Sequence, residues 1–135
     1  MRGAGCDSLL DMAQNGRFGL SVRLLAALAA APEKLHTSAA LAEALGTGPV
    51  MVRRLFPALH KAGFIVQHKG PGGGAKLKVP AKAIGLGDVM VASEHGSVHT
   101  GEKTVDGVLK RAHGDAVKAM NETSIATVVK RMKKE

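Results

Sequence analysis

Apolar residues recur at helical spacing in the first third of the chain. In the stretch RFGLSVRLLAALAAAP they include Leu24, Leu25 and Leu28, which lie three and four residues apart and predict a buried helix. Asn15 is a possible N-cap, and Pro32 ends the pattern. Residues 1–14 carry no comparable stripe and are interpreted as an N-terminal extension.

Two further helices are separated by one short turn. The segment SAALAEAL can be capped by Thr37 or Ser38, and it ends at Gly46, a residue type that suits a left-handed C-cap. The turn over residues 46–48 leads to Pro49, whose missing N–H would be unpaired at a helix start in any case. Two helices joined by a short glycine-containing turn are typical of a helix-turn-helix.

The second helix of this pair has an apolar side and a basic side. Rotation by 100° per residue places Val50 and Arg54 opposite the apolar face and Arg53 on its flank. Pro57 removes the N–H that would bond to the carbonyl of Arg53, so we expect a kink or a break there. The apolar face has the i, i+3, i+4, i+7 spacing of a core face: Val52, Leu55, Phe56 and Leu59.

Two short stretches with strand character follow. FIVQHKG is β-branched and aromatic, and AKLKVP alternates Leu77 and Val79 with Lys76 and Lys78. The glycine-rich GPGGG between them predicts a β-hairpin. A basic hairpin directly behind a helix-turn-helix is interpreted as a wing, whose lysines neutralise phosphate charge while the preceding helix enters the major groove.

The glycines of this hairpin could instead form a nucleotide-binding loop. A Walker loop counted from Gly70 requires glycine at 75 and Ser or Thr at 77, where the chain has Ala75 and Leu77. A dinucleotide loop is formally present as Gly70, Gly72 and Ala75, but it must open a helix, and the following alternation predicts a strand. Nucleotide binding is therefore disfavoured.

The C-terminal part has apolar stripes without an obvious covering layer. A short helix is expected around Ile84 and Leu86, and residues 125–132 carry a further stripe after a restart at residues 121–124. The longest stripe exceeds what so small a domain can bury, which favours an isologous dimer over a helix that folds back on its own domain. Its members, the expected dimerisation residues, are Val105, Val108, Leu109, Ala112, Ala116 and Met120.

The net charge of the chain limits the classes of partner that it can bind. The 135 residues include 19 Lys+Arg and 11 Asp+Glu, giving a formal charge of +8, which favours a polyanionic partner. Trp and Tyr are absent and Phe occurs three times, so the stacking surfaces typical of single-strand and RNA binders are scarce. Duplex DNA needs no such surface. We expect an intracellular protein without a membrane segment, because no apolar run reaches about 18 residues.

The order of these motifs resembles the BadM/Rrf-two family of bacterial winged-helix transcription regulators, from about Arg17 to the end. The helix-turn-helix block carries the resemblance, together with a wing pattern at Gly70, Gly73, Gly74 and Leu77 and a segment at Ile84, Leu86, Asp88 and Val89. Two departures stand out. Ala75 replaces the usual aromatic of the wing, and the segment SEHGSVHTGEKT, where the family carries cluster cysteines, has none.

Cysteine content bears on the cofactor. An iron–sulfur cluster needs about three or four protein ligands, usually thiolates, and Cys6 is the chain's single cysteine. We therefore expect no cluster and no other cofactor. Cys6 could be a redox switch, but an inert thiol is favoured. His95 and His99 could bind a metal together if they are helical, but a polar loop is favoured, and no metal site is expected.

The resulting interpretation is a mainly α protein with a small β-hairpin wing, and not an enzyme. Residues 1–14 form the extension, 15–92 the winged helix-turn-helix domain, 93–103 a loop and 104–135 the C-terminal dimerisation helices. We expect a cytoplasmic, nucleoid-associated homodimer that binds a near-palindromic operator and acts as a repressor. The expected DNA-binding residues are Thr37, Ser38, Thr47, Gly48, Val50, Arg53, Arg54, His68, Lys69, Gly72, Gly73, Lys76 and Lys78.

Two alternatives remain open at this stage. Arg53 and Arg54 could belong to an ordinary solvated helix face instead of contacting bases or phosphates. The same positive charge would also suit an RNA- or ribosome-associated binding protein, against which the scarcity of aromatic residues argues.

Overall fold

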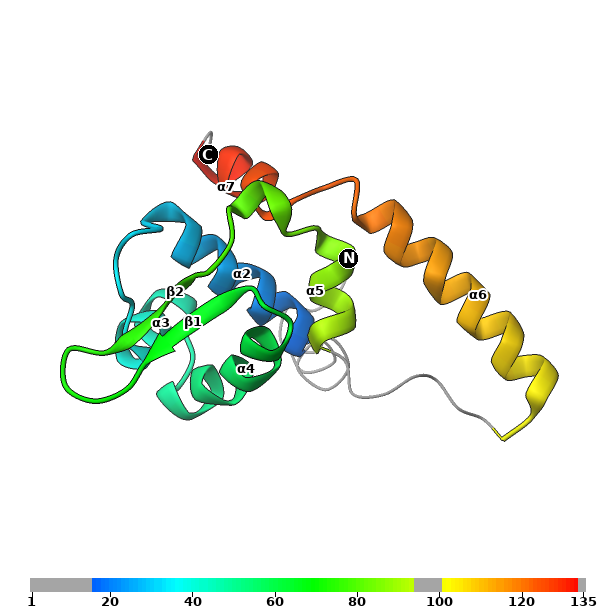
Figure 1. The fold of residues 1–135 in the computed structure, drawn as a ribbon, viewed down its shortest axis with the longest axis horizontal. Helices are drawn as coiled ribbons and strands as arrows, with labels where there is room; N and C mark the ends of the chain where they lie inside the picture. Colours follow the sequence, from blue (N-terminus) through cyan, green and yellow to red (C-terminus); the bar gives the residue numbers. More distant parts are fainter. Residues whose placement is uncertain (1–15, 94–100, 134–135) are drawn as a thin grey trace, which may run out of the picture.

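The computed structural model describes residues 16–93 and 101–133. As expected, the fold is mainly helical with one two-stranded antiparallel hairpin (Figure 1). The N-terminal extension with Cys6, and His95 and His99, lie outside the described residues. In chain order the elements are α2 (Gly16–Ala30), α3 (Ser38–Leu45), α4 (Pro49–Lys61), β1 (Ile65–His68), β2 (Gly74–Leu77), η2 (Ala81–Ala83), α5 (Leu86–Ser93), α6 (Lys103–Met120) and α7 (Ile125–Lys133).

Helix α2 is the centre of the core. Leu24, Leu25 and Leu28 have no exposed surface, as their spacing predicted, and they contribute to one continuous apolar cluster. Helices α3, α5 and α7 and strand β2 all pack against α2. Because these elements come from both ends of the described chain, the winged domain is built by long-range packing around one buried helix.

The helix-turn-helix forms at the predicted positions. Thr37 caps α3, Gly46 ends it with φ of 70°, and Pro49 opens α4. The expected break at Pro57 is not found, because α4 continues through it to Lys61. Both Pro57 and Arg53 lie on the exposed side of α4, so the carbonyl deprived of its bond faces water and the helix tolerates the loss.

The hairpin is shorter than the sequence pattern suggested, with four residues in each strand. Its register pairs Ile65 with Leu77 and His68 with Gly74. Strand β2 also bonds the segment before α3, because the backbone groups of His36 and Ala75 exchange two N–H to O bonds of 2.9 Å. Ala75, which stands where the resembling family has an aromatic residue, is fully buried. Strand β2 of the wing is therefore fastened to the segment that leads into the helix-turn-helix.

The two C-terminal helices behave differently from each other. Residues 104–135 were predicted to be dimerisation helices, but α7 packs on α2 and η2, and Ile125 is fully buried in the core. Helix α7 is therefore part of the winged domain, and the boundary drawn at residue 104 separated it from its packing partner. Helix α6 has no buried residue along its 18 positions and extends away from the body (Figure 1).

Candidate nucleic-acid interface

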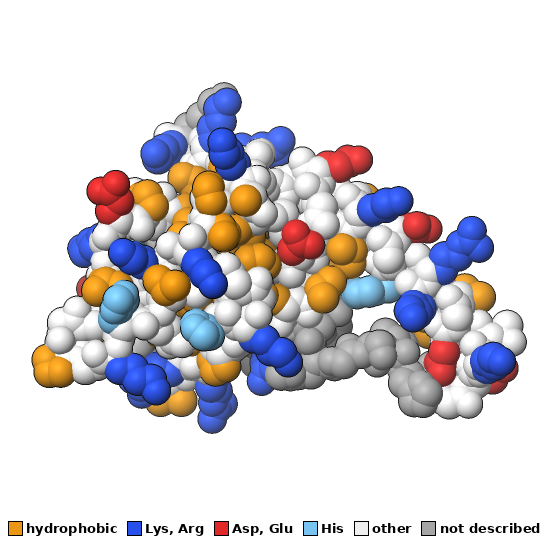
Figure 2. All heavy atoms as spheres, in the orientation of Figure 1, with side chains coloured by type: hydrophobic (Ala, Val, Ile, Leu, Met, Phe, Trp, Pro, Cys, Tyr) orange, Lys and Arg blue, Asp and Glu red, His pale blue; other side chains and the backbone are white. Residues whose placement is uncertain are grey.

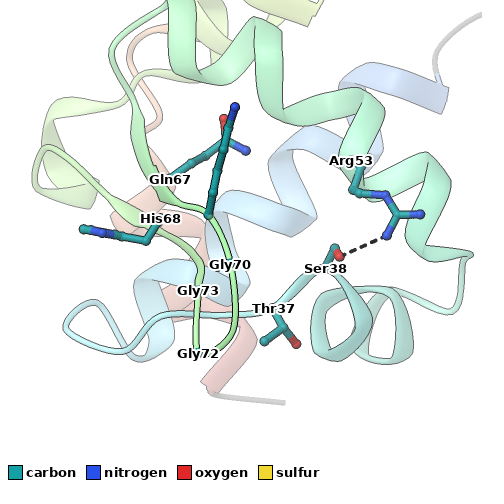
Figure 3. A pocket seen from close by; sticks show the side chains of 10 residues that line it. Thr37, Ser38, Arg53, Gln67, His68, Gly70, Gly72 and Gly73 are labelled. Atoms are coloured by element: carbon teal, nitrogen blue, oxygen red, sulfur yellow. Dashed lines mark hydrogen bonds between the residues drawn. The ribbon is translucent and has the colours of Figure 1, made fainter.

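A cleft of about 330 Å³ lies between the helix-turn-helix and the wing. It brings together residues from α3, α4 and the hairpin that are far apart in the sequence (Figure 3). Most of its lining was predicted from the sequence, namely Thr37, Ser38, Arg53, His68, Lys69, Gly72 and Gly73. The residues that the prediction missed are Gln67, Gly70 and Gly74.

On the side of the cleft next to α3, the guanidinium of Arg53 lies beside the N-terminal end of that helix. Thr37 Oγ1 accepts a hydrogen bond of 3.0 Å from the N–H of Ala40, which caps α3. Arg53 Nη1 reaches from α4 toward Ser38 Oγ at 3.5 Å, and the two side chains point toward each other (Figure 3). A guanidinium has five N–H donors, and a helix start carries partial positive charge. This side is therefore suited to phosphate oxygens.

The opposite side of the cleft is the tip of the hairpin, which is almost entirely backbone. Gly70 and Gly72 have φ values of 89° and 75°, which favour glycine. At Gly73 a side chain is excluded for a different reason, because a Cβ would collide with the carbonyl oxygen of His68. The tip can therefore approach a ligand closely, with its peptide groups as the contacting atoms.

The outward side of α4 forms a ridge beside the cleft. Val50 is 54% exposed at its first turn, and Arg54 is exposed one turn later. Thr47 and Gly48 precede this turn, and the N–H of Thr47 donates to the carbonyl of Ala42 at 3.0 Å. These four predicted residues do not line the cleft. They lie on and before the exposed start of α4, the part of a recognition helix that enters a groove.

The basic residues of the wing are divided between its tip and its base. Lys69 lies at the tip and lines the cleft. Lys76 pairs with Val66 on the hairpin, and the N–H of Lys78 donates to the carbonyl of Phe64 at 2.8 Å, beside the body. The imidazole of His68 points away from Ser38 and Arg53 (Figure 3). The cleft thus gathers Arg53 and Lys69, and leaves Lys76 and Lys78 outside it.

Gln67 lines the cleft but is absent from the predicted DNA-binding residues. It stands opposite Ala75 in the register, on the face of the hairpin that carries Ile65 and Leu77 toward the body. Strand alternation from Ile65 places it on that side. The alternation of the strand therefore indicates the position of Gln67, although FIVQHKG was predicted to be a strand from its β-branched and aromatic residues alone.

The exposed face of α6 is the second candidate interface. Val105, Val108 and Leu109 are 44%, 63% and 37% exposed, and Ala112 and Ala116 are also exposed. Met120, the last member of the predicted stripe, is half-buried near the body. Acidic and basic side chains are interspersed on the rest of the helix (Figure 2). The stripe is thus an apolar strip on an otherwise polar helix.

Two further kinds of site concern the described ranges, namely metal sites and membrane spans. They contain no group of three or more His, Cys, Asp or Glu side chains placed to hold a metal ion. Within the same ranges, no helix is both long and apolar enough to cross a membrane.

A helix-turn-helix followed by a hairpin defines a winged-helix protein. The chain matches the Rrf2 family, described as iron-dependent transcriptional regulator, over residues 14–135, and it belongs to this family. The family is one of transcription regulators and not of enzymes. The similarity includes the regulator IscR of Cereibacter sphaeroides, 39% identical over 59 residues, which are 42% of this chain and 38% of that relative.

Solved structures share the fold at low sequence identity. IscR of T. potens superimposes with a TM-score of 0.68 at 21% identity, covering 86% of this chain and 85% of that one. The oxidised form of CymR from Staphylococcus aureus gives 0.65 at 21% identity, covering 84% and 92%. A transcriptional regulator from Lactobacillus plantarum gives 0.70 at 20% identity, covering 87% and 89%. The winged-helix architecture is therefore shared over most of each of these chains.

The cysteine content of this chain bears on the iron dependence in the family description. Thiolate-held clusters take about three or four ligands, and the chain has one cysteine. The described residues offer no alternative group of ligands. The donor set present here does not fit a cluster held by the cysteines of one chain.

Proposed function

We propose that this chain is a sequence-specific, double-stranded DNA-binding transcription regulator. The observation that carries the proposal is the cleft that both Arg53 of α4 and Lys69 of the wing line, beside the exposed start of α4. A helix start, two cations and a glycine tip suit a phosphate backbone, and the adjacent ridge suits base edges. The expected location follows from the partner: the cytoplasm, in association with the nucleoid.

The two parts of the site have separate roles in this proposal. Arg54 reads guanine through two donors, and Val50 contacts a thymine methyl group in the major groove. Arg53, Ser38 and the peptide groups of residues 70–73 hold the phosphates on either side of the groove. Lys76 and Lys78, at the base of the hairpin, contribute a weaker and more distant attraction.

The regulator acts as a homodimer through α6. A second copy placed on the strip defined by Val105, Val108, Leu109, Ala112 and Ala116 removes these apolar side chains from water in both chains at once. Two-fold symmetry then presents two copies of α4 to one face of a duplex. The operator is accordingly near-palindromic, with its half-sites about one helical turn or more apart.

The dimer represses transcription and carries no iron–sulfur cluster. Repression requires only that a bound dimer occupies promoter DNA. The single cysteine supports the absence of a cluster, since even two chains together supply only two thiolates.

Fluorescence anisotropy with labelled duplexes tests this function. Duplex from upstream of the protein's own gene is compared with a scrambled duplex at several salt concentrations, and structured RNA serves as a competitor. We expect a preference of about a thousandfold or more for the operator. Equal affinity for both duplexes at physiological salt would overturn sequence-specific binding. Tighter binding of the RNA would favour the RNA-associated alternative.

A further inference from the structure

Asn121 joins the end of α6 to the start of α5. Its Oδ1 accepts a hydrogen bond of 2.9 Å from the N–H of Asp88, and its Nδ2 donates to Asp88 Oδ1 at 3.2 Å. Because one amide group both accepts from and donates to the same residue, the two helix ends are held in a single relative orientation.

Backbone bonds continue this connection into the core. The N–H of Leu86 donates to the carbonyl of Thr123, and the N–H of Ile125 donates to the carbonyl of Ile84, each at 2.9 Å. Ile84 and Ile125 are both fully buried. The contact between the two segments is therefore fixed at one end by Asn121 and at the other by the interior of the winged domain.

Two glycines permit the close approach of the segments. A Cβ at Gly85 would collide with the side chain of Asn121. A Cβ at Gly87 would collide with the backbone carbonyl oxygen of Val117 and would lie 2.8 Å from Asn121 Oδ1. A carbonyl within a helix cannot rotate aside as a side chain can. Any side chain at position 87 would thus force α6 away from α5.

Small rotations at this joint have large effects at the far end of α6. The 18 residues of the helix span about 27 Å, and only its C-terminal end lies close to the body (Figure 1). A rotation of about 10° at the joint moves the far end by about 5 Å, which exceeds the roughly 3.4 Å rise of one DNA base pair. In a dimer paired through α6, the joint therefore determines where the two copies of α4 lie.

Resting on the proposed function, we infer that Gly85, Gly87, Asp88 and Asn121 set the half-site spacing that the dimer accepts. Asn121 and Gly87 are positioning residues, which act through the placement of α4 and do not touch DNA. Two binding units held rigidly engage both half-sites at one separation and lose joint engagement at others. A loosened joint distributes the same units over several separations. The operator with the optimal spacing is then bound more weakly than by the rigid dimer, and the affinities for operators with other spacings lie closer to it.

Gly87→Ala tests this directly, with Gly114→Ala as the matched control. Gly114 is also within a helix, a Cβ there meets no atom within 4 Å, and its side of α6 is opposite the apolar strip. Affinities are measured for operators with up to about half a helical turn inserted between the half-sites. We expect the wild type and Gly114→Ala to lose about a hundredfold across this series, and Gly87→Ala about tenfold or less. A Gly87→Ala profile that superimposes on the wild-type profile overturns the inference.

A second pair of variants tests whether exchanging the two side chains restores the selectivity for half-site spacing. Asn121→Asp places two carboxylates together, whereas Asp88→Asn combined with Asn121→Asp restores one donor and one acceptor at the same atoms. We expect the single variant to flatten the spacing profile and the double variant to recover it. Loss of selectivity that the exchange does not recover would overturn the role of this side-chain pair.

A measurement without DNA separates this inference from the proposed function. Spin labels replace the exposed Glu43 and Lys110 in a Cys6→Ser background, diluted into unlabelled protein. We expect a narrow distance distribution in the wild type, a broader or shifted one in Gly87→Ala and Asn121→Asp, and a narrow one in the exchanged pair. Unchanged distance distributions in both single variants would overturn the inferred role of the joint, and would leave specific operator binding unaffected. Absence of any sequence preference in the wild type would overturn the proposed function and, with it, the spacing role.

Discussion

The winged domain and α6 both carry apolar residues at helical spacing, yet only the winged domain buries them. In α2 the leucines at 24, 25 and 28 are completely enclosed, whereas in α6 Val108 remains 63% exposed and no residue is buried. The difference does not come from the local pattern, because both stripes repeat every three to four residues. It comes from the neighbouring elements: α2 is covered by α3, α5, α7 and β2, which follow it as far as the end of the described chain, whereas α6 lies beside α5 at one end.

An amphipathic stripe therefore indicates that a helix face will be covered, but it does not indicate which surface covers that face. For α2 the cover is intramolecular and cooperative with folding. For α6 we propose that the cover is a second copy of the chain. Substitutions in the two regions should therefore affect different equilibria, folding in one case and association in the other.

The largest effect is expected from Leu109→Asp. This change places a carboxylate at the proposed two-fold interface in both chains, and burying an unpaired charge costs several kcal/mol. We expect a monomer at micromolar concentration in sedimentation equilibrium, with helical content retained. Arg111→Asp, about 200° around α6, is the control and should remain a dimer. A dimeric Leu109→Asp protein would remove α6 from the interface.

Val52→Ala should have the next largest effect, and it acts on folding. Val52 is fully buried in α4, so loss of two methyl groups and the resulting cavity should lower the free energy of unfolding by about 2–3 kcal/mol. Val50→Ala makes the same change on the same helix at a 54% exposed position and should cost less than about 0.5 kcal/mol. Urea denaturation at a fixed subunit concentration compares them, and equal losses would contradict the assigned core face.

Arg54→Ala leaves both folding and association intact in the proposal. It removes a contact to a base edge, so discrimination between operator and scrambled duplex should fall by about 1–3 kcal/mol. Anisotropy titrations with both duplexes measure it, and Lys130→Ala on α7 is a matched loss of one charge. An equal fall in affinity for both duplexes would assign Arg54 to phosphate and not to a base.

Lys69→Ala sharpens the distinction between the tip and the base of the wing. Because Lys69 lines the cleft, its loss should weaken all duplexes alike and reduce the salt slope by about 1. Lys78→Ala removes the same charge at the base of the hairpin and should change the slope by less. If the two variants behave identically, proximity to the cleft does not decide which lysine meets DNA.

Gly114→Ala is expected to have the smallest effect and the opposite sign. An exposed glycine within a helix costs roughly 0.5–1 kcal/mol relative to alanine, and a Cβ at this position meets nothing. We expect slightly higher helicity by circular dichroism and an unchanged association constant. A weaker dimer would place the interface on the side of α6 that carries Gly114.

Much of the local structure could be predicted from the sequence. Thr37, Gly46 and Pro49 marked the ends of the helix-turn-helix because capping and the missing N–H of proline act within a few residues. The glycine spacing from Gly70 argued against a Walker loop, and the strand pattern after Ala75 argued against a dinucleotide loop. Pro57 does not end α4, because the consequence of a lost backbone bond depends on whether its carbonyl faces water.

The candidate site was predictable where one element supplied it and less so where several met. Arg53 was placed correctly on the flank of α4, but its approach to Ser38 and the tip of the wing depends on how the hairpin is fastened through His36 and Ala75. For the same reason Lys69, Lys76 and Lys78 looked equivalent in the sequence, although only Lys69 lines the cleft.

The sequence by itself determined which segments are helices and strands, which face of each is apolar, the net charge of +8 and the single cysteine. These properties follow from side-chain periodicity, capping and composition, which operate over a few residues. Only the tertiary structure decided that α7 returns to α2, that α6 stays uncovered, and that Asn121 meets Asp88 across two glycines. Those outcomes depend on which distant surfaces are complementary in shape, and no local pattern records that complementarity.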